Sequence, residues 1–231
     1  MAERLRERVV GGELQPGARL PNEAVLARDY GVSRATVREA LRALAAQNLI
    51  RTAKGAGGGS YVTLPSVSGV SDFLHSNITL LADADDVTLD DLLEARELLE
   101  VPAARLAAKR RSEADIERLR ATVLDEPLEL GALEQFTYNR EFHAVVIEGC
   151  GNALLLMAAQ PVFDVLQRNL ARSTLGRGFH RAINEHHRLI AAAIEGGDAD
   201  AAGDEMHVHL DYLRPFYEKA WRHAARARSR A

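Results

Sequence analysis

The stretch Gly31–Leu41 constrains the fold of this chain more than any other. Ser33 is a good helix N-cap, because its hydroxyl can accept a hydrogen bond from an unpaired backbone N–H of the first turn. Apolar residues then recur at three- and four-residue spacing: Val37, Ala40, Leu41 and Leu44. Arginines repeat every fourth residue along another face: Arg34, Arg38 and Arg42. The pattern predicts a helix that buries one side and presents a cationic side.

A short helix and a glycine turn precede this stretch, and a glycine-rich hairpin follows it. We expect the short helix from Asn22 to Asp29, with Gly31 in the turn, where glycine adopts a positive φ at little cost. Two β-prone runs, 49–52 and 60–63, flank a glycine-rich segment. Helix, turn, helix and two-stranded wing together predict a winged helix-turn-helix, which inserts the start of its second helix into the major groove of DNA.

Polar residues of the second helix and the wing are the candidates for contacts with DNA. An arginine can bond guanine O6 and N7 bidentately, so Arg34 and Arg38 are expected to read bases. The remaining candidates are expected to contact phosphate, and such contacts position the protein without reading the base sequence directly. The predicted DNA-binding set is Ser33, Arg34, Thr36, Arg38, Arg42 and Lys54. The alternative for the arginines is a solvated helix face with local pairing to Glu39.

Four segments of the first 64 residues form an ordered match to a known family. They are Gly12–Glu23, Gly31–Arg34, Val37–Leu41 and the glycine-rich wing with Tyr61-Val62. In these segments the chain resembles the GntR family of bacterial transcription regulators. The resemblance implies a homodimer that reads a pseudo-palindromic, double-stranded operator. Members often carry a DNA-contacting arginine after the residue that corresponds to Glu23, and this chain has Ala24 there.

Charge is distributed unevenly along the chain. The net charge of −4 is not that of a nucleic-acid binder. Residues 1–65, however, hold 10 Lys+Arg and 6 Asp+Glu, a net of +4, which leaves a net of −8 for the rest. The acidic remainder repels DNA and helps to direct the basic part toward it.

The cysteine content and the hydropathy indicate the compartment. The single Cys150 excludes an intramolecular disulfide framework and fits a reducing cytoplasm. No apolar run approaches the roughly 20 residues that a membrane-spanning helix needs. We therefore expect a cytoplasmic protein with no membrane partner.

Beyond residue 87 the pattern is helical, with no convincing strand. Residues 66–87 are expected as the connection between domains, with room for a helix from Val67 to Leu81. Helical patterns then fit 88–109, 112–123, 131–149, 152–173, 178–195 and 198–227. The predicted fold is mainly α: a winged helix-turn-helix over 1–65, a linker over 66–87 and an all-α bundle of about six helices over 88–231.

Three of these predicted helices direct an imidazole toward the core. Asn139 and His143 lie four residues apart in one apolar stripe, and His209 lies in another. His186 and His187 both accompany the isoleucines of the helix 178–195, and spacing alone does not choose between them. A single core histidine is readily satisfied by a hydrogen bond. Burying several together is costly unless something binds them, and neutral imidazole is the commonest metal ligand, so the pattern predicts a site for Zn²⁺, Ni²⁺, Mn²⁺ or Fe²⁺.

A second ordered match covers residues 90–215. It comprises Glu94–Glu100 with Ala103-Ala104, Phe142-His143, Gly151-Asn152, Glu185-His186 with Ala193-Ile194, Gly197-Asp198 with Ala202, and Met206–Leu210. In these residues the chain resembles the FCD domain, the helical ligand-binding domain of FadR-like GntR regulators. The resemblance implies a divalent metal, with Zn²⁺ as the expected ion. The implied ligands are Asn139, His143, His186 and His209, and Asn139 stands where the family's metal-binding members have aspartate.

The same resemblance implies an effector. In FCD domains a small carboxylate commonly binds at the metal, and an arginine of the first bundle helix lines the pocket. Arg96 matches that arginine and could clamp a carboxylate bidentately. Its alternative role is an ion pair with Glu100, one helical turn later.

These features support a metabolite-responsive DNA-binding transcription regulator. The main alternative is a metal-dependent, hydrolase-like enzyme domain fused to a DNA-binding module. Against it, no inward carboxylate beside the predicted ligands suggests a general base. An acyl-CoA-sensing relative without metal would lack the histidines found here, and an architectural DNA binder would use a metal for stability alone.

Overall fold

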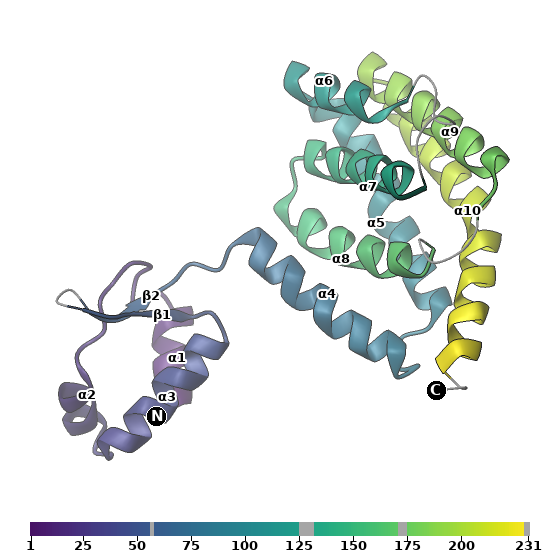
Figure 1. Cartoon of the computed structure of the whole chain (residues 1–231). Coiled ribbons are helices and arrows are strands. Elements are labelled where there is room, and N and C mark those ends of the chain that lie inside the picture. The colour runs from purple at the N-terminus through teal and green to yellow at the C-terminus, as the bar shows by residue number, and fades with distance from the viewer. Residues whose placement is uncertain (56–57, 125–131, 171–174, 229–231) are drawn as a thin grey trace. The chain divides into compact units, whose positions relative to one another are not determined.

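The computed structural model describes residues 1–55, 58–124, 132–170 and 175–228. Their contacts divide the chain into two compact units, Met1–Ser66 and Val67–Ala231 (Figure 1). The architecture is mainly α, with one two-stranded sheet, and this confirms the predicted fold class. Most of the expected connection 66–87 is the helix α4 (Val67–Asp83), which packs along α8 (Ala153–Leu170) and belongs to the second unit.

Three helices and the hairpin form the first unit. The helices are α1 (Ala2–Val10), α2 (Glu23–Tyr30) and α3 (Arg34–Ala46), and the strands are β1 (Ile50–Ala53) and β2 (Gly59–Val62). The strands are antiparallel, with Ile50 opposite Val62. The shared core consists of Leu5, Leu20, Leu44, Ile50 and Val62. Burial of these side chains fixes α3 against the hairpin.

Local hydrogen bonds set the turn between α2 and α3. Asn22 caps α2 by accepting a bond from the N–H of Val25, and Ser33 caps α3 by accepting one from the N–H of Thr36 at 3.1 Å. Gly31 adopts the left-handed conformation, with φ of 64°, and its N–H bonds carbonyls of the last turn of α2. The predicted cap and turn are therefore confirmed.

The second unit is a bundle built around α5 (Leu89–Arg110). The other helices are α6 (Glu113–Thr122), α7 (Ala132–Gly149), α9 (Arg177–Gly196) and α10 (Ala199–Arg228), besides α4 and α8. α5 contacts α7, α8, α9 and α10, and buried alanines at 103, 104, 107 and 108 permit close helix approach (Figure 1). Residues 171–173 of the helix predicted over 152–173 lie outside the described part. None of the described helices is both long and apolar enough to cross a membrane.

Gly31 provides a test of the turn. No atom lies within 4 Å of a Cβ built at this glycine, so Gly31→Ala meets only the cost of the left-handed conformation. We expect a loss of about 1–2 kcal/mol in the free energy of unfolding of the first unit. Amide hydrogen exchange of α2 and α3 measures it. The control is Gly178→Ala in α9, where a Cβ also meets no atom and φ is not positive. Equal protection of the α2 and α3 amides in the two variants would contradict the prediction.

Candidate functional site

The candidates for DNA contact lie exposed on α3 and at the wing. All six predicted residues are exposed: Ser33, Arg34, Thr36, Arg38, Arg42 and Lys54. Those on α3 face outward because Val37, Ala40 and Leu44 occupy its inner face. The start of α3 therefore presents polar groups as a recognition helix requires.

Local ion pairs hold two of the α3 arginines. Arg42 bonds Glu39 at 2.6 Å, which is the alternative pairing considered from the sequence. Arg38 lies 3.4 Å from Glu23 of α2, and Arg34 forms no ion pair with any residue that the structure describes. Exposed pairs of this kind contribute at most about 1 kcal/mol, so they do not prevent an exchange of partner toward DNA phosphate or bases.

Three buried histidines converge in the bundle from three helices. His143 of α7, His187 of α9 and His209 of α10 are at most 2% exposed. One ring nitrogen of each lies within 4.8 Å of the others, and the two Nε2 atoms of His143 and His209 are 3.2 Å apart. Phe142 stacks on His187 with ring centroids 3.7 Å apart and holds its ring in place.

His187, rather than His186, completes this group. We expected His186 here from the resemblance, whereas the three-histidine group of the structure contains His187. His187 is buried in phase with Ile183, Ile190 and Ile194, whereas His186 is half-buried and packs edge-on against Tyr212. The spacing of four, three and four residues from Ile183 to Ile194 already contains this signal, because it follows one helix face.

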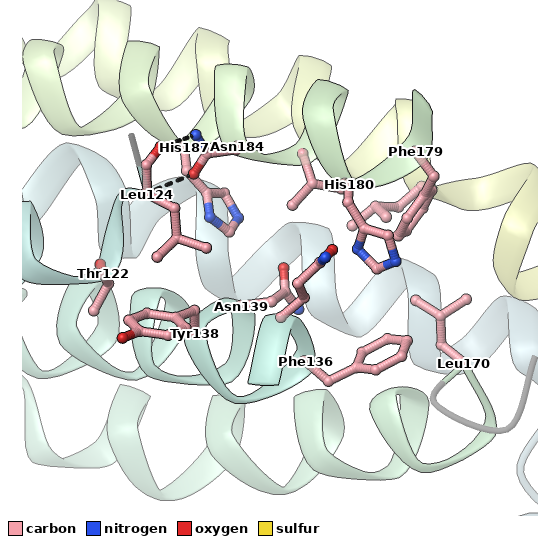
Figure 2. A pocket seen from close by; sticks show the side chains of 13 residues that line it. Thr122, Leu124, Phe136, Tyr138, Asn139, Leu170, Phe179, His180, Asn184 and His187 are labelled. Atoms are coloured by element: carbon pink, nitrogen blue, oxygen red, sulfur yellow. Dashed lines mark hydrogen bonds between the residues drawn. The ribbon is translucent and has the colours of Figure 1, made fainter. Parts of the chain in front are cut away.

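Asn139 lines a small cavity beside this group. The cavity holds about 30 Å³ and is lined by His187, Asn184 and Phe136 among others (Figure 2). Such a volume accommodates a bound water. Asn184 is engaged elsewhere, because its amide bonds the backbone N–H and carbonyl of Leu124. Figure 2 shows Asn139 extending into the cavity. In the sequence of α7, Asn139 comes one helical turn before His143.

Arg96 and Glu100 of α5 complete the buried polar network. Arg96 donates from Nε to Glu100 at 2.7 Å and from Nη1 to the hydroxyl of Tyr217 at 2.8 Å, and its Nη2 lies 3.2 Å from His143 Nε2. The other oxygen of Glu100 lies 2.5 Å from His143 Nδ1. Arg96 thus points inward and also forms the alternative pair with Glu100. Glu100 was missed as a site residue, although its spacing from Arg96 places it on the same helix face.

Burial and neighbouring charge set the protonation states. Burial opposes ionisation of Glu100, but the Arg96 guanidinium and His143 outweigh it and lower the pKa of Glu100 to about 2. Burial lowers the pKa of His143 and holds the pKa values of His187 and His209 well below their usual range, with Arg96 acting in the same direction. The three imidazoles are therefore neutral at pH 7, which is the form that binds metals.

The donor atoms fit a divalent metal. Nδ1 of His186, Nε2 of His187 and Nδ1 of His209 are buried and have no hydrogen-bond partner among the described residues, and of these only Nε2 of His187 is a candidate ligand atom in the three-histidine group. Leaving buried nitrogens unpaired is costly unless something binds them. Two nitrogens on one Zn²⁺ at about 2.0–2.1 Å in tetrahedral geometry lie about 3.4 Å apart. This is close to the 3.2 Å between Nε2 of His143 and Nε2 of His209, so Nε2, and not Nδ1, is the ligand atom that the geometry of His209 fits.

Comparisons with known proteins agree with both halves of this structure. Family models match residues 1–59, described as "Bacterial regulatory proteins, gntR family", and residues 91–212, described as "FCD domain". The chain belongs to the GntR family. It is 31% identical to the HTH-type transcriptional regulator LutR of Bacillus subtilis, over 91% of this chain and 98% of that protein.

Other relatives are similar over comparable lengths. An Escherichia coli protein, whose name assigns it to regulation of the L-lactate dehydrogenase operon, is 30% identical over 97% of this chain and 89% of its own length. A solved GntR structure from Streptococcus agalactiae has a TM-score of 0.65 at 30% identity, covering 93% of this chain and 97% of that one. This GntR protein is therefore a DNA-binding transcription regulator with an FCD domain, and the enzyme alternative is set aside because its relatives are named as regulators.

The buried histidines make the stability of the metal-free protein depend on pH. His187 and His209 stay neutral when folded, whereas the unfolded chain protonates them below about pH 6.5. The unfolded state then binds more protons, so the free energy of unfolding falls as the pH falls from about 7.5 to 5.5. Each buried histidine contributes up to about 1.4 kcal/mol per pH unit to this decrease. Urea unfolding of chelator-treated protein measures this slope.

A matched pair of variants assigns the slope to the buried group. His187→Gln removes one buried imidazole and is expected to flatten the profile. His223→Gln, at an exposed position of α10, is the control for removing an imidazole outside the buried group. A His187→Gln profile as steep as that of the parent would contradict the assignment.

Proposed function

We propose that this GntR protein is a metabolite-responsive regulator that binds a divalent metal and a small carboxylate in its FCD domain. The convergence of His143, His187 and His209 in the bundle core, with Nε2 of His187 left unpaired, carries this proposal. A buried imidazole nitrogen without a partner is costly, and a metal ion bound at Nε2 of His187 would satisfy it.

Three histidines would hold the metal, with Zn²⁺ as the proposed ion and Ni²⁺, Mn²⁺ or Fe²⁺ as alternatives. Asn139, one turn before His143, is the proposed oxygen ligand, and its neutral amide contributes less than a carboxylate would. Bound metal supplies a positive charge to which a carboxylate can coordinate. The protein's own part is to keep the imidazoles neutral and to exclude bulk water from the core.

The proposed effector is a small carboxylate. Arg96 supports this class, because its buried guanidinium lies 3.2 Å from His143 and can bond a carboxylate bidentately. The name of the Escherichia coli relative also refers to L-lactate, which is a small hydroxycarboxylate.

Operator binding is proposed to use a homodimer in the cytoplasm. Arg34 and Arg38 would read bases in each half-site, while Ser33, Thr36, Arg42 and Lys54 would contact the DNA backbone. Effector binding changes operator affinity only if the effector binds one arrangement of the dimer more tightly than the other.

The arginines of α3 are expected to differ in effect. Arg38→Ala should remove the preference for operator over unrelated DNA, because a bidentate base contact is worth about 1–3 kcal/mol of discrimination. Arg42→Ala should weaken binding to all sequences and lower the slope of log affinity against log salt by about one unit. Fluorescence anisotropy over a salt series measures both, and unchanged operator preference in Arg38→Ala or an unchanged slope in Arg42→Ala would refute the respective assignment.

Neighbouring histidines of α9 test the metal site. Protein purified without a metal-affinity tag should contain close to one metal per chain, and His187→Gln should abolish that content. His186→Gln, one residue away and outside the group, should retain it. Elemental analysis gives the stoichiometry. No metal in the parent after equilibration with Zn²⁺, Ni²⁺ and Mn²⁺ would remove the metal from the proposed function and leave the DNA-binding role intact.

A further inference from the structure

A single carboxylate joins the proposed metal ligand His143 to the proposed effector clamp Arg96. Glu100 is 1% exposed, and each of its oxygens has one partner. Oε1 accepts a bond from Arg96 Nε at 2.7 Å, and Oε2 lies 2.5 Å from His143 Nδ1. No other acidic side chain in the described part of the chain bonds or pairs with these two groups, so Glu100 alone supplies their negative charge there.

The bond to Glu100, together with the Arg96 guanidinium on the other side of the ring, decides which nitrogen of His143 carries the proton. An ionised carboxylate can only accept, so Nδ1 of His143 must be the donor. Nε2 then keeps its lone pair, and this atom lies 3.2 Å from His209 Nε2 and 3.2 Å from Arg96 Nη2. A metal ligand needs that lone pair directed into the site.

We propose that Glu100 is a positioning residue, which fixes the Nδ1–H tautomer of His143 and the orientation of Arg96, and so ties metal affinity to the effector clamp. The metal part of this inference rests on the proposed function, whereas the tautomer part concerns the protein alone. Arg96 has a second support in Tyr217, so loss of Glu100 affects His143 more directly than it affects the guanidinium.

A glutamine at this position cannot satisfy both partners. Its amide has one acceptor and one donor side, and Arg96 Nε is always a donor. If the amide oxygen faces Arg96, the amide N–H faces His143 Nδ1 and drives the imidazole proton to Nε2, which removes the lone pair. If the oxygen faces His143, the amide N–H opposes the guanidinium N–H. Glu100→Gln therefore disrupts one of the two contacts without changing the size of the side chain.

The experiment compares Zn²⁺ affinity and histidine tautomers. Competition with a chromogenic chelator should show Zn²⁺ binding weakened about 10- to 100-fold in Glu100→Gln, the usual range for loss of such a partner. Nitrogen-15 NMR of the metal-free full-length protein should show Nδ1–H as the single tautomer of His143 in the parent and a mixture with Nε2–H in the variant. Glu97→Gln is the matched control, because Glu97 of α5 pairs at 3.0 Å with the exposed His207, outside the site.

A second pair of variants covers the case in which Glu100→Gln does not fold. Arg96→Met combined with Glu100→Gln removes both buried charges but keeps an acceptor for His143, whereas Arg96→Met combined with Glu100→Leu keeps none. Replacing a buried ion pair by apolar groups is often tolerated. At least tenfold weaker Zn²⁺ binding in the leucine variant than in the glutamine variant supports the role of Glu100, and equal affinities overturn it.

The two readouts separate this inference from the proposed function. If the parent binds Zn²⁺ and Glu100→Gln binds it equally well with Nδ1–H retained as the single tautomer, Glu100 is not a positioning residue. If the parent binds no metal, the proposed metal function fails, and the histidine spectrum alone decides whether Glu100 sets the tautomer of His143.

Discussion

Burial of the Arg96–Glu100 pair on the central helix is the constraint on which the core of the second unit depends. Charges taken out of water are stable only when every donor and acceptor is matched. The remaining donors and acceptors of the pair bond His143 of α7 and Tyr217 of α10, so three helices share one polar network. Apolar packing alone would tolerate small rotations of these helices. Hydrogen bonds tolerate only smaller rotations, because their strength depends on the direction of donor and acceptor. The network thereby gives the alanine-rich interface of α5 a defined register.

Most of the architecture could be predicted from local sequence signals. Gly31 and Ser33 mark the turn and the start of α3 because their conformational and capping preferences act within a few residues. Thr88 and Ser112 mark the starts of α5 and α6 in the same way, each through a capping box. The three-residue and four-residue spacing of apolar side chains then gave the remaining helices to within about two residues where the structure describes their ends.

The candidate site was predicted less completely, because its contacts join helices distant in sequence. His143 and His209 lie where their apolar stripes indicated, but matching to a family motif chose His186, and only the phase with the isoleucines of α9 identifies His187. In the sequence, Glu100 is only a glutamate four residues after an arginine, a spacing that commonly gives a surface ion pair on a helix. Its role depends on an imidazole 43 positions later. α4 was expected mainly as a connection, because its serines weaken the apolar periodicity by which a packed helix is predicted. Its apolar side packs on α8.

The two bonds of Glu100 also limit how this site can evolve. Positions 96 and 100 share one ion pair, and position 100 shares a second bond with position 143. A substitution of Arg96 leaves a buried carboxylate partly unmatched, and that imbalance reaches the imidazole of His143 on α7. A change at Arg96 therefore requires a compensating change at residue 100, so residues 96, 100 and 143 are expected to covary among descendants of this protein. The exposed arginines of α3 form no buried ion pair with the described residues and can change one at a time.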